Sequence, residues 1–225
     1  MIIREFNVRD FNLKYFVGIN QIRFDLDYFL NVFDTSNEKE LLDQFFKTVD
    51  GVQQQFKNSV LQFIKNRYVL NQDHIFIACY FLQKVFYYNL NISNKKKIEL
   101  LLYLSTNRQI SRSIHAFGIN SSDLSSGNLL YCIISPINNL NNINDEILKV
   151  LKADETELLI NIQSNEKFNL IREYFEISEQ QIACILNSYG IDKNSLNSNL
   201  LSKITALYDL ICERMALLNI EKTLR

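Results

Sequence analysis

The sequence has few of the residues that break regular structure. Its 225 residues include one proline, five glycines and no tryptophan. Because glycine and proline are the commonest interruptions of helices, their scarcity favours long helices and leaves few places for sharp turns. Hydrophobic residues make up 47% of the chain, which is enough to bury a substantial core. No shift of composition, repeat or linker divides the sequence, so we expect a single domain over residues 1–225.

An excess of one charge is also lacking, since 24 basic residues stand against 25 acidic ones and the formal net charge is −1. A neutral total removes any global electrostatic argument for nucleic-acid binding, so such a site would have to be a local patch. No stretch approaches the roughly 18 apolar residues of a membrane span, and the N-terminus does not resemble a signal peptide. We therefore expect a cytoplasmic protein, also nuclear if eukaryotic, with no membrane partner.

The motifs of common enzyme and metal sites are absent from the sequence. It contains no GxxxxGK[ST] phosphate loop, GxGxxG fingerprint, HExxH or GxSxG. Cys79, Cys132, Cys184 and Cys212 lie far apart among apolar neighbours without a CxxC pair, so we expect reduced core cysteines. The two histidines fall on different predicted helices, which argues against a metal. We predict a protein that is not an enzyme and has no cofactor; an enzymatic role would need a titratable cluster in a deep pocket.

Hydrophobic periodicity predicts strands and helices in one α+β domain. Strands are expected in segments rich in aromatic, β-branched or continuous apolar residues: 1–6, 14–24, 67–70, 128–135 and 157–162. A helical pattern begins at a cap on Ser36, is interrupted at Gly51 and resumes over residues 60–64. Further helices are expected where apolar residues recur at helical spacing: 25–33, 72–88, 141–151, 165–175, 178–189 and from Ser198 to the C-terminus.

Residues 99–119 have the pattern of two helices joined by a short polar break. The break is Ser105-Thr106-Asn107, whose side-chain oxygens are suited to accept hydrogen bonds from the amides of a helix start. Ile110, Ile114 and Phe117 follow at i, i+4 and i+7, which places them on one face of the second helix. We expect that face to be buried.

Two basic features border this pair of helices. The lysines at 95–97 open the first helix, where cations oppose the helix dipole, so local stability does not explain them. Arg108 follows the polar break, at a helix start whose amides favour anions, and the side chains of Asn107 and Gln109 add donors. A solvated face for the lysines and a structural cap for Asn107 stay open as alternatives to phosphate binding.

These residues resemble the core motif of the PRPK-binding protein (TPRKB) family, the small kinase-binding subunit of the KEOPS complex, also called EKC. Archaeal members typically read E-[IL]-L … SGxRQIxEAI … GI. The matching positions are Glu99-Leu100-Leu101, Leu104-Ser105, Arg108-Gln109-Ile110, Ile114 and Gly118-Ile119. The starting residues 1–4 and segments 69–79, 171–177 and 209–218 are similar to further parts of the family in the same order.

The sequence departs from the family pattern at three places. Thr106 and Asn107 stand where archaeal members have a glycine and its neighbour, and Ser113 stands where alanine is usual. Residues 36–66 are the least matched region, and we expect them to be a lineage-specific helical extension.

The resemblance implies a non-catalytic adaptor. Members of this family bind the N-terminal lobe of the small atypical kinase/ATPase of KEOPS. That kinase in turn binds the transferase subunit that makes N6-threonylcarbamoyladenosine at position 37 of ANN-decoding tRNAs. Archaeal members also recruit tRNA through its 3′ CCA end. The implied fold is a small mixed β-sheet covered by several α-helices, with a long C-terminal helix.

The same resemblance suggests two groups of site residues. The helix over 72–88 is apolar on most faces, so part of it completes the core or meets the kinase. Its candidate kinase contacts, each with completion of the core as the open alternative, are Phe76, Tyr80, Val85 and Tyr87. A single-stranded 3′ end needs phosphate donors and platforms for unstacked bases. The candidate tRNA contacts are Asn107, Arg108, Gln109 and Ile110, with Lys95, Lys96 and Lys97 nearby. The alternative function is a stand-alone helical protein-interaction module without RNA binding.

Overall fold

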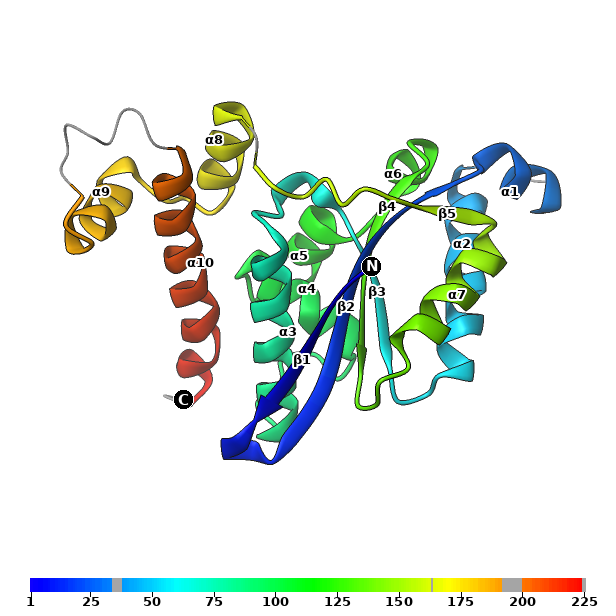
Figure 1. The fold of residues 1–225 in the computed structure, drawn as a ribbon, viewed down its shortest axis with the longest axis horizontal. Helices are drawn as coiled ribbons and strands as arrows, with labels where there is room; N and C mark the ends of the chain where they lie inside the picture. The colour runs from blue at the N-terminus through cyan, green and yellow to red at the C-terminus, as the bar shows by residue number, and fades with distance from the viewer. Residues whose placement is uncertain (34–37, 163, 192–199, 224–225) are drawn as a thin grey trace. The chain divides into compact units, whose positions relative to one another are not determined.

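The computed structural model describes residues 1–33, 38–162, 164–191 and 200–223. Strands and helices follow one another along the chain in an α+β arrangement, as Figure 1 shows, so the predicted fold class is confirmed. Contacts between residues group the chain into two compact units. Unit 1 comprises residues 1–65 and 118–159, and unit 2 comprises residues 66–117 and 160–225. The single domain expected over residues 1–225 stays a prediction.

Unit 1 is built on an antiparallel sheet. Its described strands are β1 (Ile2–Val8), β2 (Leu13–Phe24), β3 (Val60–Ile64), β4 (Asn128–Ser135) and β5 (Ala153–Thr156). β4 lies between β2 and β3, while β1 and β5 share the other edge of β2. Asn12 between β1 and β2 has φ 46°, a left-handed conformation that asparagine tolerates and that lets the chain reverse. Every described pairing is antiparallel, so the sheet is not the mixed one that the resemblance implied.

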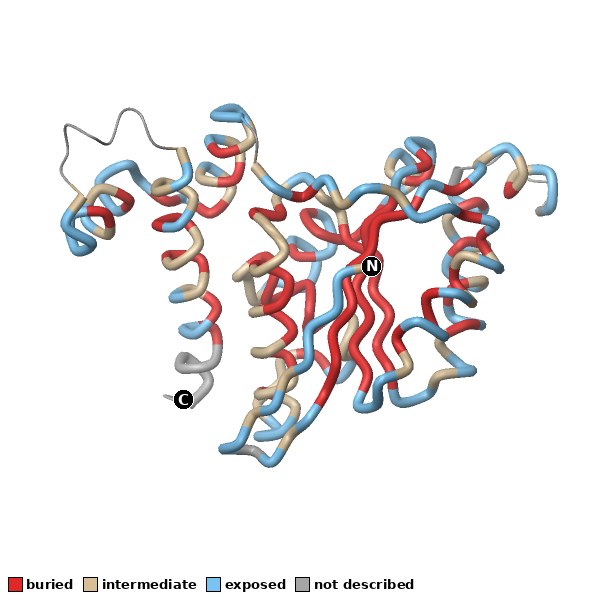
Figure 2. Tube along the Cα trace, viewed as in Figure 1, coloured by how far each residue is buried: buried red, intermediate tan, exposed pale blue. Residues whose placement is uncertain are grey.

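The helices of unit 1 cover one side of this sheet. They are α1 (Leu26–Phe33), α2 (Glu38–Gln55), α6 (Ser121–Ser125) and α7 (Leu140–Leu151). Their core joins Phe45 of α2 and Ile147 of α7 to Phe63 and Tyr131 of the sheet. Figure 2 shows the central strands buried and β1 largely exposed. β1 is therefore an edge strand, at the N-terminal segment where a strand was expected.

Residues 60–64 correct the sequence analysis, because they form β3 and do not resume a helix. All five are buried and pair with β4, so tertiary pairing decides between the two structures. Gly51 does not interrupt α2, which continues to Gln55. The cap expected at Ser36 lies outside the described residues. So does Ser198, the expected start of the last helix.

Unit 2 is helical over its described residues. Its elements are η2 (Asn66–Tyr68), α3 (Gln72–Tyr87), α4 (Lys96–Ser105), α5 (Ile110–Phe117), α8 (Asn165–Tyr174), α9 (Glu179–Ser188) and α10 (Leu200–Thr223). The strand expected at 67–70 is instead a short 3-10 turn followed by irregular backbone. The strand expected at 157–162 is wrong as well, because the pairing with β2 falls on residues 153–156. No described helix has both the length and the hydropathy needed to cross a membrane.

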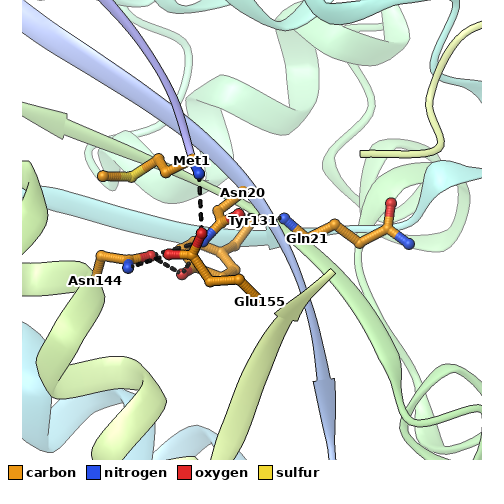
Figure 3. A network of polar contacts seen from close by, with 6 residues as sticks. All are labelled: Met1, Asn20, Gln21, Tyr131, Asn144 and Glu155. Carbon is orange, nitrogen blue, oxygen red and sulfur yellow. Dashed lines mark hydrogen bonds and ion pairs between the residues drawn. The ribbon is translucent and has the colours of Figure 1, made fainter. Parts of the chain in front are cut away.

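The core of unit 1 also holds a polar network that no sequence pattern indicated (Figure 3). Asn20 Nδ2 and the Tyr131 hydroxyl both donate to Asn144 Oδ1, at 2.8 and 2.5 Å. Asn144 Nδ2 donates to Glu155 Oε1 at 2.6 Å, and the ammonium of Met1 lies 3.0 Å from Glu155 Oε2. Partial burial raises the pKa of Glu155, but these two donors outweigh it and lower the pKa overall. The network thus ties the N-terminal Met1 to β2, β4, α7 and β5.

Candidate functional site

The turn between α4 and α5 is closed without a glycine. Thr106 has φ 48°, a left-handed conformation, and its backbone N–H donates to the carbonyl of Tyr103 at 3.1 Å. The N–H of Asn107 donates to the carbonyl of Leu102, also at 3.1 Å. These bonds satisfy the last carbonyls of α4 in the way that a glycine-ended helix does. The polar break predicted from the sequence is therefore a tight reversal.

Asn107 stabilises the turn just before the next helix. Its side-chain Oδ1 accepts the backbone N–H of Gln109 at 2.8 Å, and α5 begins at the next residue, Ile110. Because the carbonyl of Gln109 accepts the first bond of the helix, from the N–H of Ser113, the Asn107 bond is an asparagine turn in front of the helix and not a cap on its first turn. Asn107 therefore has a structural role, alongside any role in binding.

A buried pair of hydroxyls lies under this turn. Ser105 Oγ of α4 and Ser113 Oγ of α5 are 2.6 Å apart, and both side chains are buried. Ser113 Oγ is also 3.2 Å from the carbonyl of Asn107 and 3.1 Å from that of Gln109. Burial raises the pKa of Tyr174 to about 12, while its hydrogen bond with Ser105 acts in the opposite direction.

Arg108 is half-buried and partly engaged within unit 2. Its Nη1 donates to the carbonyl oxygen of Leu218 on α10 at 3.1 Å. This contact holds one side of the guanidinium against α10 and fixes its direction. A guanidinium presents its N–H donors in a planar fork, the geometry that suits a phosphate.

The solvent face of α5 differs from the face that its periodicity predicted. Ile110 and Ile114 are 42% and 41% exposed, whereas the buried side chains of this helix are Ser113, Ala116 and Phe117. Small residues at two of these three positions suit a close approach to neighbouring elements. Sequence reasoning placed Ile114 in the core because spacing alone cannot tell a buried apolar stripe from a binding surface.

Charged residues accompany this exposed apolar pair. Arg112 lies between Ile110 and Ile114 in sequence and is exposed, and so is His115. Arg112 is two residues from each isoleucine, so it lies about 160° away from them around the helix, at the other border of the exposed arc of α5. The described part of α5 thus exposes two isoleucines on one side and an arginine on the other, and Arg108 lies in the turn before it. Arg112 and Ile114 are site candidates that the sequence analysis missed.

The three lysines do not join this surface. They lie at the start of α4, and the polar turn lies at its end, ten residues later. At about 1.5 Å rise per residue, the helix separates the two groups by roughly 15 Å. Lys96 Nζ lies 5.3 Å from the ring centre of Phe86, and burial lowers its pKa. The expectation that Lys95, Lys96 and Lys97 lie near the turn is corrected by this separation.

The candidate kinase contacts on α3 fall into two groups. Phe76 and Val85 are buried, which fits the open alternative that they complete the core. Tyr80 is half-buried, and Tyr87 is 51% exposed. Tyr88, which the sequence analysis did not single out, is 47% exposed and meets Tyr87 edge-to-face, with ring centres 5.1 Å apart. The end of α3 thus presents a pair of exposed aromatic rings.

The remaining titratable groups form no metal site in the part of the chain that is described. Cys79 and Cys132 are buried, as expected of core cysteines, but Cys184 is exposed and Cys212 is partly exposed. All four are free thiols, and burial raises the pKa of Cys212 to about 11.

A surface cavity of about 480 Å³ lies in unit 1. Its charged lining residues are all exposed and carry both signs: Arg23, Asp25, Asp27, Lys152 and Asp154. It contains none of the predicted site residues, and exposed groups of mixed charge are not the buried titratable cluster that an enzymatic role would need.

The family to which these elements belong is shown by comparison with family models. The model of the kinase-binding protein CGI-121 family matches residues 29–219. The chain belongs to this family. The match confirms the resemblance to the PRPK-binding protein family, and it includes the region 36–66, whose role as a lineage-specific extension stays a prediction. No curated protein matches the chain. A kinase is thus the partner class of the family, which suggests a binding subunit without catalysis.

Proposed function

We propose that this kinase-binding protein is a non-catalytic adaptor of KEOPS that also recruits tRNA. It binds the small atypical kinase/ATPase of the complex and, through it, meets the transferase subunit. It receives the 3′ CCA end of tRNA during synthesis of N6-threonylcarbamoyladenosine at position 37. The observation that supports the tRNA part is the exposed pair Ile110 and Ile114 on α5, a helix that also exposes Arg112 and directly follows Arg108.

The chemistry of this surface suits a single-stranded nucleic acid. Its arginines offer several donors in the planar geometry that a phosphate accepts. The isoleucines offer an apolar surface for bases that are not stacked within a duplex. Because the whole chain carries a formal net charge of −1, attraction to a polyanion depends on such a local patch.

The proposed kinase surface is the end of α3. Tyr87 and Tyr88 offer exposed aromatic area together with hydroxyl groups, a combination that is enriched at the centres of protein interfaces. Tyr80, half-buried on the same helix, extends this surface. Phe76 and Val85 support α3 from within the core, so their part in binding is indirect.

One observation favours the alternative of a protein-interaction module without RNA binding. The bond from Arg108 to the Leu218 carbonyl gives this arginine a structural task within unit 2. In that case Ile110 and Ile114 would be anchors for a protein, and the chain would show no salt-dependent affinity for tRNA.

Titration of tRNA against the full chain, co-expressed with the kinase, separates these functions. The adaptor function predicts tighter binding of intact tRNA than of tRNA lacking CCA. Arg112→Glu is the preferred variant, because this side chain is exposed and its replacement leaves the Arg108 contact in place. Loss of a charge-assisted contact predicts about tenfold weaker binding of intact tRNA, with kinase binding retained.

The matched control is the same charge reversal at Lys47, which is exposed on α2 in unit 1. Lys47→Glu changes the net charge as much as Arg112→Glu does, and should leave tRNA affinity within about twofold. Equal affinity of the parent chain for tRNA with and without CCA would contradict the CCA role.

A further inference from the structure

The end of α3 and the start of α4 meet at one corner of unit 2, the α3–α4 corner (residues 84–97). Asn89 has φ 56°, and this left-handed residue ends α3 and turns the chain back. Lys96 begins α4, and its Nζ lies 5.3 Å from the ring centre of Phe86 in the last turn of α3. The exposed tyrosines at the end of α3 and the lysines at the start of α4 therefore share this corner.

A buried carboxylate holds the loop between the two helices. Glu99 of α4 is fully buried, and its Oε2 accepts the backbone N–H of Ile92 at 3.0 Å and that of Ser93 at 2.6 Å. Hydrogen bonds from amides to a carboxylate are among the stronger ones in proteins, so the loop has a fixed course. The negative charge of Glu99 is spent inside the fold and does not offset the lysines at the surface of the corner.

The corner carries a local excess of positive charge. Between His74 and Ile98 the sequence has no aspartate or glutamate, whereas the formal net charge of the whole chain is −1. The stretch contains four lysines: Lys84, Lys95, Lys96 and Lys97. Three of them stand at the start of α4, where cations oppose the helix dipole. Residues that break a local rule without a gain in stability point to a function.

The lysines border the exposed tyrosines from two helices. Lys84 precedes Tyr88 by four residues, so it lies one turn earlier on the same face of α3. Lys96 reaches from α4 to the last turn of α3, and burial lowers its pKa. Lys95, next to it, is exposed. Because lysine stems cover apolar surface while their ammonium groups stay at its edge, the aromatic pair is flanked by cations.

The geometry of the two rings favours a protein over nucleic-acid bases. Tyr87 and Tyr88 meet at an interplanar angle of 86°, so the edge of one ring covers part of the face of the other. Stacking of successive bases requires open ring faces. An aromatic centre with a charged border is instead the usual anatomy of a protein–protein interface. The sign of the border requires a partner with carboxylates around its apolar contacts.

We infer that the α3–α4 corner receives an acidic segment of the kinase. Carboxylates of that segment meet Lys84, Lys95 and Lys96, and its apolar side chains pack on the two tyrosines. The lysines accelerate association by attracting the segment, and the tyrosines slow dissociation by packing against it. This inference rests on the proposed kinase surface at the end of α3 and adds the chemistry of the segment that binds there.

The test measures association and dissociation rates of the full chain with purified kinase at two salt concentrations. Lys95→Glu should slow association about fivefold at about 50 mM salt, with a difference below about twofold at about 500 mM, because salt screens the attraction. Its dissociation rate should change by less than about twofold. Lys96→Met keeps the stem packed on Phe86 without the charge, and should slow association about twofold. Lys47→Glu, exposed on α2, is the matched control and should leave both rates within about 1.5-fold.

Stability provides a readout of opposite sign. Glutamate in place of Lys95 puts an acid at the start of α4, where the helix dipole favours it. The unfolding midpoint of Lys95→Glu should therefore equal or exceed that of the parent. Slower association without a lower midpoint supports the inference, since damage to the fold would lower both. Tyr87→Ala should show the other pattern, with faster dissociation and an association rate close to that of the parent.

The outcomes separate this inference from the proposed function. A parent chain that does not bind the kinase overturns the proposed function itself. Kinase binding that weakens in Tyr87→Ala but keeps the association rate of the parent in Lys95→Glu and Lys96→Met, at both salt concentrations, overturns the inference alone. Faster association of Lys95→Glu also overturns it, because it indicates a basic segment. Weaker tRNA binding by Lys95→Glu without the kinase, together with unchanged kinase association, would assign the lysines to RNA and overturn it as well.

Discussion

The imidazole of His74 joins α3 to α4 through a hydrogen bond from Nε2 to the carbonyl oxygen of Leu104, 3.1 Å away. Nδ1 accepts the backbone N–H of Leu70 at 3.2 Å, so the ring proton must be on Nε2. A second proton on Nδ1 would face an N–H donor. Complete burial lowers the pKa of His74 to about 4, since the charged ring would have no water around it.

This depressed pKa predicts that unit 2 loses stability in mild acid. The ordinary pKa is 6.5, so between pH 6.5 and about 4 the unfolded chain binds a proton that the folded chain does not. The part of the free energy of unfolding that depends on a neutral His74 is fully present above pH 6.5 and decreases as the pH falls through this window. From pH 7 to pH 5 the free energy of unfolding should fall by about 2 kcal/mol on this account. Denaturant unfolding at the two pH values measures it.

Replacement of each histidine isolates the effect. His74→Gln should remove this part of the pH dependence, although it lowers stability at pH 7. His115→Gln is the control, because His115 is exposed and its loss should leave the pH dependence as it is in the parent. The same pH dependence in the parent and in His74→Gln would show that His74 is not the group responsible.

Thr106→Gly should stabilise the protein. A left-handed conformation costs a residue with a Cβ about 1–2 kcal/mol, whereas glycine adopts it freely. The greater freedom of glycine in the unfolded chain offsets part of this gain. The free energy of unfolding should therefore rise by about 1 kcal/mol, as measured by denaturant titration. Thr205→Gly, in the right-handed α10, should instead lower it by about 0.5 kcal/mol. Destabilisation by both changes would contradict strain at Thr106.

Local signals explain what the sequence predicted correctly. The continuous apolar run of β4 and the polar break before α5 depend on residues close together in the chain. The asparagine turn at Asn107 is another such signal, since its oxygen accepts from an amide two residues later. Signals of this range are present in a single sequence, so the α+β class and the helix pair around the site were predictable.

The errors have non-local or ambiguous causes. Five consecutive apolar positions at 60–64 suit a buried helix as well as a strand, and only pairing with β4 decides. Ile114 follows the helical spacing of a core residue, yet other positions of α5 face inward. The bond from Arg108 to the Leu218 carbonyl joins the turn to α10, which no local pattern indicates. The candidate site was thus predictable as a segment, but its exposed face and its support were not.

Asn144→Ala should destabilise unit 1 strongly. The Asn144 side chain accepts from Asn20 and Tyr131 and donates to Glu155, all through side-chain bonds. Without the Asn144 side chain, the buried Asn20 amide and Tyr131 hydroxyl lose this acceptor, and the free energy of unfolding should fall by about 2–3 kcal/mol. Thermal or denaturant unfolding measures the loss. Asn142→Ala, exposed on the same helix, should change stability by less than about 0.5 kcal/mol. Similar small effects of both changes would indicate that water replaces Asn144 in the network.

Removal of Tyr87 or Tyr88 should weaken binding to the kinase. The two rings pack edge-to-face at the end of α3, so each holds the other in a fixed direction before binding, which limits the side-chain entropy lost in the complex. Tyr87→Ala and Tyr88→Ala should each reduce kinase affinity by at least about tenfold, as truncation of central aromatic anchors does. Calorimetric titration of the full chain with purified kinase measures the change.

The control for this surface is Phe46→Ala, which removes an exposed ring from α2 in unit 1. Because Phe46 packs against Phe45, its loss affects local packing and should leave kinase affinity within about twofold. Unfolding midpoints of all three variants separate binding from stability. Full kinase affinity in both tyrosine variants, with unchanged unfolding, would move the kinase surface away from the end of α3. Loss of affinity in Phe46→Ala alone would place that surface on unit 1.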